Sequence, residues 1–483
     1  MILVIDVGTT GLRAALVDAD AAIVATEYRA FAPDTPFPGL VEFDASAMAR
    51  LVLDAAHAVI DRSGSAPIDG VGIAAQRAST VMWDRATGEP IGPALGWQDL
   101  RTVGECIAAR AEHGLELAPN QTATKVGWLL ANAAAGRSPA DLCVGTVDSW
   151  IAWTLTAGAV HVTDHTNAAV TGLYSISTGA WNDAICDTLG IEMSMLPRIV
   201  DSTGVIAPAT ALPGAPPIAG LVGDQQASLI GQGCLERGRA KITFGTGGML
   251  DVCTGTARPD GVHRSDNGTF AIVAWSGRGA THFGVEAIML SAGTNVEWLR
   301  DDMGLIDSAA ASHDVARRCD TTDGVTYVPA LLGLGTPQWD YGARGTLLGI
   351  TRGTNRSHIV RAVLEGVAHR GADLVAAAEA DTGLTIPTLR IDGGMSENPT
   401  FAQALADASG KAVEVSPVVD STTLGAAFLA GVAMDTWDDL ADAAGNVQHA
   451  AVVEPGEPLD RAVWSEALLR AGAWFPELSA LDF

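Results

Sequence analysis

The sequence is poor in positive charge. It carries 29 lysine and arginine residues against 56 aspartate and glutamate residues, which gives a formal net charge of −27 at pH 7. An acidic surface of this kind repels nucleic acids and anionic membranes, so we expect neither as the main partner. Any site for a polyanion must therefore concentrate positive potential locally, through backbone N–H groups and a few well-placed cations.

Cysteine is also scarce, and its six residues are scattered without a CxxC pair. We expect a reduced, cytoplasmic protein without a zinc site. No basic segment precedes the first apolar stretch, so we expect no signal peptide. The uncharged run at residues 204–223 contains four prolines, and we interpret it as a linker and a strand, not as a membrane helix. The cysteines are Cys106, Cys143, Cys186, Cys234, Cys253 and Cys319.

The two common nucleotide-binding motifs, GxGxxG and GxxxxGK[ST], are both missing, which argues against a Rossmann fold and a P-loop. Two other stretches resemble each other instead: residues 3–18 (LVIDVGTTGLRAALVD) and 241–252 (KITFGTGGMLDV). Each runs from an apolar segment through Gly and Thr residues into a second apolar segment. Glycines bring backbone N–H groups close to an anion, and Arg13 adds a guanidinium suited to phosphate oxygens.

Two such hairpins facing one cleft would hold a polyphosphate from both sides, which predicts a nucleotide-dependent phosphotransferase. Two ordinary hairpins with glycine turns are the alternative, because short Gly-rich motifs are weak signals. Asp6 favours the functional interpretation. It lies inside an apolar strand, where a carboxylate is costly unless it has a partner such as a metal ion.

With 483 residues, the chain is expected to form two large domains. Its 48% hydrophobic and 18% charged residues are typical of a well-packed globular protein. Strand-like and helix-like segments alternate in both halves, which predicts α/β layers. We expect an N-terminal domain at residues 1–233 and a C-terminal domain at 234–483, with a nucleotide between them. Helices are expected at 44–61, with Asp44 as the N-cap, at 358–380 and at 421–434.

Asp224 is the candidate catalytic base. It follows the apolar residues 221–222 and precedes an apparent helix, so its carboxylate would be exposed at the end of a strand. There it could accept the proton of a hydroxyl group that receives a phosphoryl group. The same residue could instead be the N-cap of that helix, and the local pattern leaves both interpretations open.

Several longer strings give the chain a family resemblance. Six strings of the chain occur in the same order in one family. They are residues 122–130 (TATKVGWLL), 145–156 (GTVDSWIAWTLT), 161–168 (HVTDHTNA), 327–340 (YVPALLGLGTPQWD), 345–365 (GTLLGITRGTNRSHIVRAVLE) and the DGG at 392–394. On these strings the chain resembles the FGGY carbohydrate kinases, and among them the glycerol kinases, over essentially its whole length. The resemblance implies two actin-like (ribonuclease-H-like) α/β domains flanking a nucleotide cleft, with ATP as phosphoryl donor and Mg²⁺ as cofactor.

The resemblance also implies roles for single residues. Asp224 corresponds to the catalytic base, and Gln225 beside it to a residue that hydrogen-bonds the acceptor. Asp6 corresponds to an aspartate that orients Mg²⁺. The nucleotide contacts correspond to Thr9, Thr10, Gly11, Arg13, Gly245, Thr246, Gly247, Gly293, Gly394 and Asn398. Glu297 stands where the family has an ATP-contacting glutamine, so that role is not assigned to it.

The acceptor pocket departs from the glycerol kinase pattern. Arg77 and Trp97 are retained, but Ala78 stands where glycerol kinases have a glutamate that grips glycerol, and Asn120 where they have a tyrosine. We therefore expect a small polyol or sugar as acceptor, either glycerol or something longer. A pentulose kinase of the same family and a non-catalytic actin-fold nucleotide sensor are the alternatives. A homodimer is left open.

Overall fold

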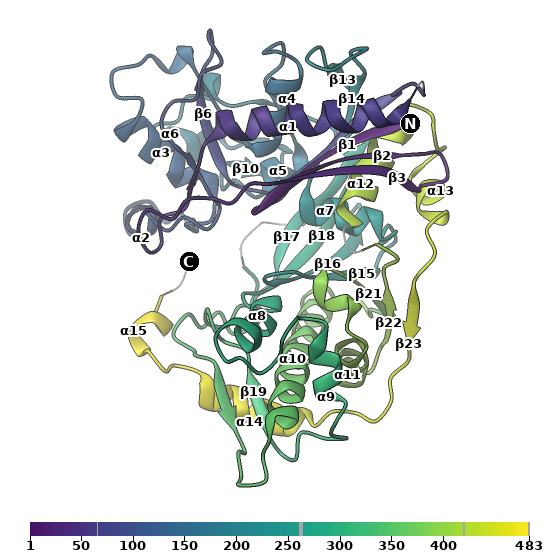
Figure 1. The fold of residues 1–483 in the computed structure, drawn as a ribbon. Helices are drawn as coiled ribbons and strands as arrows, with labels where there is room; N and C mark the ends of the chain where they lie inside the picture. Colours follow the sequence, from purple (N-terminus) through teal and green to yellow (C-terminus); the bar gives the residue numbers. More distant parts are fainter. Residues whose placement is uncertain (65, 260–263, 419–420, 482–483) are drawn as a thin grey trace.

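The computed structural model describes residues 1–64, 66–259, 264–418 and 421–481. Two central sheets, one from each half of the chain, form its framework. In Figure 1 the first half lies in the upper part of the view and most of the second half in the lower part. The predicted α/β layering in two halves is confirmed.

The first sheet has six strands in the order β13-β14-β5-β1-β2-β3. Strand β1 pairs antiparallel with β2 and parallel with β5. Strand β5 is followed in the sheet by β14, parallel to it, and then by antiparallel β13. The bounds are β1 Ile2–Val7, β2 Gly11–Val17, β3 Ile23–Ala30, β5 Gly70–Ala75, β13 Thr203–Pro208 and β14 Pro217–Gly223.

The second sheet repeats this arrangement with the order β17-β18-β16-β15-β21-β22-β23. Strand β15 pairs antiparallel with β16 and parallel with β21, as β1 does with β2 and β5. The bounds are β15 Ala240–Phe244, β16 Gly248–Gly255, β17 Phe270–Gly277, β18 Ala280–Met289, β21 Thr388–Asp392, β22 Ala412–Val415 and β23 Ala451–Val453. Each predicted Gly-rich hairpin therefore joins two adjacent strands of its sheet.

Smaller sheets complete each half. A four-stranded sheet has the order β4-β7-β6-β8, with β4 Glu42–Phe43, β6 Thr80–Asp84, β7 Ala94–Leu95 and β8 Leu142–Thr146. The two-stranded pairs are β10 Tyr174–Ser175 with β11 Ala180–Trp181, β9 Val162–Asp164 with β12 Arg198–Val200, and β19 Thr326–Val328 with β20 Thr346–Leu348.

The helices cover the faces of the sheets. Helix α1 (Ala45–Ile60) begins where expected, since the Asp44 side chain accepts a hydrogen bond from the Ala47 amide. The predicted helices in the second half are α10 (Arg356–Thr382) and α12 (Ser421–Ala433). The others are α2 Val103–His113, α3 Thr122–Asn132, α4 Val147–Leu155, α5 His165–Ala169, α6 Asp183–Leu189, α7 Asp224–Gly231, α8 Gly293–Asp301, α9 Ala311–Ala316, α11 Pro399–Ser409, α13 Leu440–Gly445, α14 Arg461–Ala471 and α15 Pro476–Ser479. Within the described ranges every helix is too short or too polar to cross a lipid bilayer.

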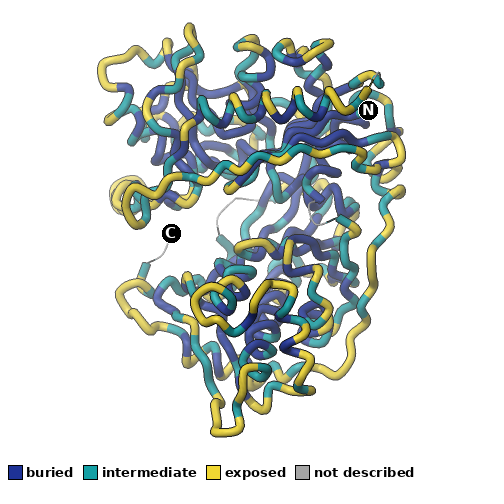
Figure 2. The backbone as a smooth tube through the Cα atoms, in the orientation of Figure 1, coloured by how far each residue is buried: buried dark blue, intermediate teal, exposed yellow. Residues whose placement is uncertain are grey.

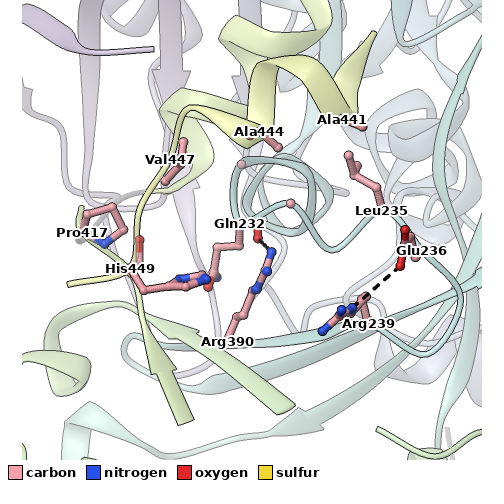
Figure 3. Close-up of a pocket in the computed structure, with 14 residues that line it drawn as sticks. Gln232, Leu235, Glu236, Arg239, Arg390, Pro417, Ala441, Ala444, Val447 and His449 are labelled. Carbon is pink, nitrogen blue, oxygen red and sulfur yellow. Dashed lines mark hydrogen bonds and ion pairs between the residues drawn. The ribbon is translucent and has the colours of Figure 1, made fainter. Parts of the chain in front are cut away.

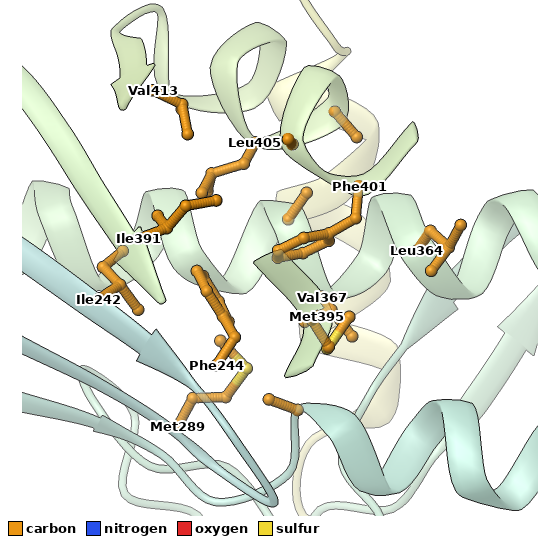
Figure 4. Packing of buried hydrophobic residues seen from close by; sticks show 14 of the residues in the cluster. Ile242, Phe244, Met289, Leu364, Val367, Ile391, Met395, Phe401, Leu405 and Val413 are labelled. Atoms are coloured by element: carbon orange, nitrogen blue, oxygen red, sulfur yellow. The ribbon is translucent and has the colours of Figure 1, made fainter. Parts of the chain in front are cut away.

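Buried strands and the inner faces of helices form the cores, while exposed residues lie mainly at the outer helix faces and loops (Figure 2). In the second half, the sheet packs against α10 and α11 through large apolar side chains (Figure 4). Phe244 and Phe401 meet edge to face with their ring centroids 4.7 Å apart. Because Phe244 ends β15, this packing anchors the strand immediately before the second Gly-rich turn.

Helix α12 crosses back to the first sheet. It packs against α7, β14, β5 and β1, and its Leu424 and Phe428 share a core cluster with Val4 of β1. Just beyond α12, the Trp437 Nε1 donates a hydrogen bond to the Ala19 carbonyl at 3.0 Å. The first sheet is thus covered by a helix that lies in the chain between strands β22 and β23 of the second sheet. The division at residues 233/234 stays a prediction.

Candidate active site

The first Gly-rich hairpin turns between β1 and β2. The Gly8 amide donates to the Gly11 carbonyl at 2.9 Å, and the Phe31 amide donates to the Thr10 carbonyl at 3.0 Å. A Cβ on Gly11 would lie 2.1 Å from the Tyr28 hydroxyl, so the turn packs closely against β3. Thr10 is exposed, and Arg13 lies opposite Asp6 in the strand register. The hairpin thus presents Thr10 at its tip, with a carboxylate and a guanidinium on adjacent strands behind it.

The second hairpin turns between β15 and β16 and exposes Gly245 and Thr246. The start of helix α8 supports it. The Gly293 amide donates to the Gly245 carbonyl at 2.8 Å, and the Ala292 amide donates to the Thr246 carbonyl at 2.9 Å. A Cβ on Gly293 would lie 2.5 Å from the Gly245 carbonyl oxygen, and one on Gly247 would lie 2.7 Å from the Met289 carbonyl oxygen. Gly293 is therefore required for helix α8 to lie this close to the second hairpin. This requirement holds whether or not Gly293 contacts a nucleotide.

A third glycine turn follows β21, next to the second hairpin. Gly393 has φ +83°, and its Cβ would lie 2.5 Å from the Phe244 carbonyl oxygen. Gly394 is exposed, with open space where a side chain would begin. Asn398 caps helix α11 by accepting from the Phe401 amide at 3.2 Å, and its Nδ2 donates to the Ser312 hydroxyl at 2.8 Å. The Asn398 amide thus has structural partners at both ends, and its predicted contact with adenosine stays a prediction.

These three turns fit a nucleotide, because exposed glycine backbone and threonine hydroxyls can approach phosphate oxygens closely. The donor set also fits Mg²⁺. Among the described residues, no group of three or more histidine, cysteine, aspartate and glutamate side chains could hold a metal ion. Mg²⁺ is commonly bound by one or two carboxylates together with substrate phosphates and water, so Asp6 beside a phosphate-binding turn suffices.

Asp224 begins helix α7 at the end of β14. The N-cap position is occupied by Gly223, so the interpretation of Asp224 as the N-cap is wrong. The Gly223 amide donates to the Thr166 hydroxyl at 2.8 Å, which fixes the end of the strand. The Asp224 side chain is 27% exposed, and its Oδ1 lies 3.4 Å from Arg77 Nε. The carboxylate is therefore held in place yet accessible.

Arg77 joins the two halves of the molecule. Its Nη2 lies 2.7 Å from Glu286 Oε2, and Glu286 belongs to β18 of the second sheet. Its Nη1 is buried and has no hydrogen-bond partner within the described chain, so a hydroxyl of a bound acceptor could satisfy it. The structure thus brings Arg77 and Asp224 together, and their roles toward an acceptor stay predictions.

Burial dominates the protonation of this cluster. It raises the pKa of Asp224, while the positive charge of Arg77 opposes the rise. Burial also raises the pKa of Glu286 to about 7, and the positive charge of Arg77 opposes this rise as well. For Arg77 itself, burial would lower the pKa, but the charges of Glu286 and Asp224 outweigh it and raise the pKa. A carboxylate with a raised pKa binds a proton more readily than an ordinary aspartate, while the neighbouring Arg77 favours the ionised form that a base requires.

Trp97 connects the acceptor side with the first hairpin. Its indole Nε1 donates to the Thr9 hydroxyl at 3.1 Å, and its backbone amide donates to the Ser79 hydroxyl at 2.9 Å. Ser79 in turn donates to Gln76 Oε1 at 2.9 Å, and Gln76 Nε2 donates to the Gly8 carbonyl at 3.1 Å. The predicted aromatic wall is therefore fixed directly to the predicted phosphate turn.

The two departures from the glycerol kinase pattern lie in different environments. Ala78 is buried beside Arg77 with φ +62°, and its carbonyl accepts from the Thr122 hydroxyl at 3.0 Å. Asn120 is exposed in the turn that precedes α3. Ala78 is thus positioned to change the shape of a pocket, whereas a role for Asn120 stays a prediction.

Two buried charged residues near Asp224 were not predicted. Glu286 and Lys241 lie on strands of the second sheet, and Lys241 donates to Gln225 Oε1 at 2.6 Å. The signal was present in the sequence, since each interrupts an apolar strand, as Asp6 does. Their partners come from distant parts of the chain, so the signal alone could not show where they point.

A pocket among the described residues lies elsewhere, at the end of helix α7 (Figure 3). It encloses about 810 Å³, part of it open to solvent, and contains none of the predicted site residues. Arg390 there donates to the Gln232 carbonyl, and Arg239 Nε lies 4.0 Å from Glu236 Oε2. Both guanidinium groups are thus engaged by the protein itself.

Comparison with known proteins agrees with this geometry. Residues 1–231 match the N-terminal domain, and residues 240–434 the C-terminal domain, of the FGGY family of carbohydrate kinases. The chain is 40% identical to the glycerol kinase of Deinococcus radiodurans, with 98% of each chain covered. Its structure is similar to Plasmodium falciparum glycerol kinase with ADP, at 30% identity, a TM-score of 0.88 and 98% of each chain. A xylulose kinase from Lactobacillus acidophilus shares the fold, at 22% identity, a TM-score of 0.82 and 94% of each chain. The predicted pair of actin-like domains is confirmed.

Proposed function

The chain belongs to the FGGY family of carbohydrate kinases, and we propose that it transfers the terminal phosphoryl group of ATP to a hydroxyl of glycerol. It is an ATP-dependent phosphotransferase that acts on the alcohol group of a small polyol or sugar. Glycerol is better supported than a pentulose, because relatives about 40% identical over nearly the whole chain are glycerol kinases. The predicted sensor without catalysis has no such support.

The proposed chemistry centres on Asp224. An acceptor hydroxyl oxygen forms a bond to the terminal phosphorus of ATP, the bond from that phosphorus to the ADP oxygen breaks, and Asp224 takes the hydroxyl proton. The observation that carries this assignment is the partly exposed Asp224 carboxylate with its Oδ1 3.4 Å from Arg77 Nε. Arg77 keeps Asp224 oriented, and its unpaired Nη1 is available to an acceptor oxygen.

The three glycine turns would bind the nucleotide. Thr9, Thr10, Gly11 and Arg13 would contact phosphates from the first sheet, and Gly245, Thr246 and Gly247 from the second. Asp6 would hold Mg²⁺, which neutralises charge on the phosphates when it is bound. Trp97 would lie against the carbon chain of the acceptor while its indole fixes Thr9.

A longer polyol is the second candidate acceptor, and Ala78 is the observation that favours it. A charged hydrogen bond contributes ~1.5–3 kcal/mol. Loss of the glutamate found there in glycerol kinases would weaken glycerol recognition by ~10- to 150-fold if nothing replaces it. An alanine side chain is also smaller than that of a glutamate, which would favour an acceptor with further carbons beside Arg77.

An ADP-release assay over glycerol, tetritols, pentitols, hexitols and ketoses tests this proposal. Glycerol-dependent ADP formation that exceeds the rate with every ketose is the expected result. A longer polyol with kcat/KM at least ~10-fold above glycerol would replace glycerol as the acceptor. ADP formation that no acceptor stimulates would contradict the kinase assignment and favour the nucleotide sensor.

The remaining expectations concern location and assembly. We propose a cytoplasmic protein, which six free thiols favour. A homodimer stays a prediction, and size-exclusion chromatography with light scattering would test it.

A further inference from the structure

Lys241 is a buried cation beside the catalytic helix. It lies on β15 of the second sheet, and its side chain is 0% exposed. Its Nζ lies 2.7 Å from Asp251 Oδ2 on the neighbouring strand β16, opposite Lys241 in register. It also donates to Gln225 Oε1 at 2.6 Å and to the Thr243 hydroxyl at 2.9 Å. Lys241 thus links the second sheet to the residue that follows Asp224.

These contacts determine which end of the Gln225 amide faces Lys241. A lysine ammonium has three donors and no acceptor, and Lys241 hydrogen-bonds Gln225 and Thr243 while forming an ion pair with Asp251. The Gln225 atom at 2.6 Å must therefore be the oxygen, because the amide nitrogen cannot accept a hydrogen bond. The Nε2 of Gln225 is then left as a donor for other groups.

We propose that Lys241 is a positioning residue that fixes the Gln225 amide, so that the site accepts an acceptor molecule with a hydrogen-bond-accepting oxygen at that point. The inference rests on the proposed function, in which Gln225 binds a non-reacting hydroxyl of the polyol. A hydroxyl or carbonyl oxygen can accept from Gln225 Nε2. A group that can only donate, such as an ammonium, would leave Nε2 facing another donor.

The surrounding charges explain how a lysine is tolerated at this depth. Asp251 compensates it and lies opposite Glu286 in the β16–β18 register, and Glu286 in turn binds Arg77. Burying an ion pair is expensive compared with apolar side chains of similar volume. Fixing the orientation of Gln225, which no apolar residue could do, gives this pair a role in specificity.

Analogues that can only accept or only donate test the orientation. At C2 of glycerol, dihydroxyacetone is the accepting analogue and 2-amino-1,3-propanediol the donating one. At C3, 3-fluoro-1,2-propanediol is the accepting analogue and 3-amino-1,2-propanediol the donating one. At the carbon facing Gln225, wild-type enzyme is expected to prefer the accepting analogue. In Gln225→Met this preference should disappear.

The decisive variant is Lys241→Met with Asp251→Leu, which removes both charges and leaves the net charge unchanged. Lys241→Met alone would leave Asp251 buried without its partner and risks unfolding, whereas a paired apolar replacement is often tolerated. Without Lys241 the Gln225 amide can rotate, and the preference for the accepting analogue should shrink at least ~5-fold, mainly through KM. A cooperative thermal unfolding transition would show that the variant is folded.

Asp251→Asn is the matched control, because it keeps Lys241 and the contact with Gln225. It leaves Lys241 buried without its counter-charge, so it is compared only after thermal unfolding shows that it is folded. Its preference should not shrink. A folded double variant that keeps the full wild-type preference would overturn the role of Lys241. Wild-type enzyme that phosphorylates neither glycerol nor a longer polyol would instead overturn the proposed function, and this is measured before any variant is compared.

Discussion

The two Gly-rich hairpins occupy equivalent places in the two sheets but differ in charge. Strands β3-β2-β1-β5-β14-β13 correspond in order and direction to β18-β16-β15-β21-β22-β23. In the first hairpin, Asp6 lies opposite Arg13. At the corresponding register of the second hairpin, Thr243 lies opposite Met249. At this register, next to the turn, the first hairpin thus places oppositely charged residues side by side and the second places uncharged ones. The charged pair of the second hairpin, Lys241 and Asp251, lies two residues farther from its turn.

This difference suggests that the two hairpins of the repeated fold contribute different groups to nucleotide binding. The first hairpin would supply charge to metal and phosphate, and the second would supply backbone amides and the Thr246 hydroxyl. The second sheet also carries charges farther from the turn, where Lys241 on β15 contacts Gln225 and Glu286 on β18 contacts Arg77. Repetition of the fold therefore does not predict equal contributions to catalysis.

The largest expected effect comes from Asp6. Asp6→Asn should lower kcat at least ~100-fold, because it removes the charge proposed to hold Mg²⁺ near the phosphates. Titration of activity with Mg²⁺ should show a higher half-saturating concentration than in the wild type. A variant with wild-type kcat and Mg²⁺ dependence would remove the proposed asymmetry between the hairpins.

A change at the tip of the second hairpin should have a milder effect. Thr246→Val removes one neutral hydroxyl and should lower kcat/KM for ATP by ~2- to 12-fold. The KM for the acceptor should stay near its wild-type value, which steady-state kinetics with each substrate varied can establish. A loss as large as that of Asp6→Asn would show that both hairpins matter equally.

Both halves of the molecule contain buried acids, and Asp148 is one in the first half. Burial raises the pKa of Asp148 to about 7, and the Thr163 hydroxyl donates to it at 2.7 Å. Between pH 4 and 7 the folded state keeps a proton that the unfolded state has lost, so this residue lowers stability as pH rises. The Tm of Asp148→Asn relative to wild type should therefore increase by at least ~2 °C from pH 4 to 7. Parallel Tm curves for the two proteins would refute this assignment.

The smallest expected effect is at Gly394. A Cβ there meets nothing within 4 Å, whereas one on Gly393 would lie 2.5 Å from the Phe244 carbonyl oxygen. Gly394→Ala should leave Tm within ~1 °C of wild type and raise the KM for ATP only a few-fold. Gly393→Ala, the matched control, should be clearly destabilised. Equal Tm losses in both variants would contradict the open space at Gly394.

The sequence predicted features that depend on local chemistry. The Asp44 cap, the two Gly-rich turns and the apolar helix at 421–434 each follow from residues close together in the chain. The resemblance added the positions of Asp224 and Arg77, which the structure brings into contact. A strand-end aspartate could still be mistaken for a helix cap, because the two differ only by where the helix begins.

Long-range contacts could not be predicted in the same way. The return of α12 to the first sheet and the contact of Glu286 with Arg77 depend on how two domains meet. The alternation of apolar and charged residues marks Lys241 and Glu286 as unusual, but it does not reveal their partners. The exposure of Asn120, which was expected in the acceptor pocket, likewise depends on the path of a turn.

The proposed function depends most on Asp224 as the base that accepts the hydroxyl proton of the acceptor. The most direct test measures acceptor-dependent ADP formation and ATP binding for Asp224→Asn. We expect turnover to fall by ~10²- to 10⁴-fold while the Kd for ATP stays within a few-fold of wild type. A variant that keeps a third of wild-type turnover would contradict the account.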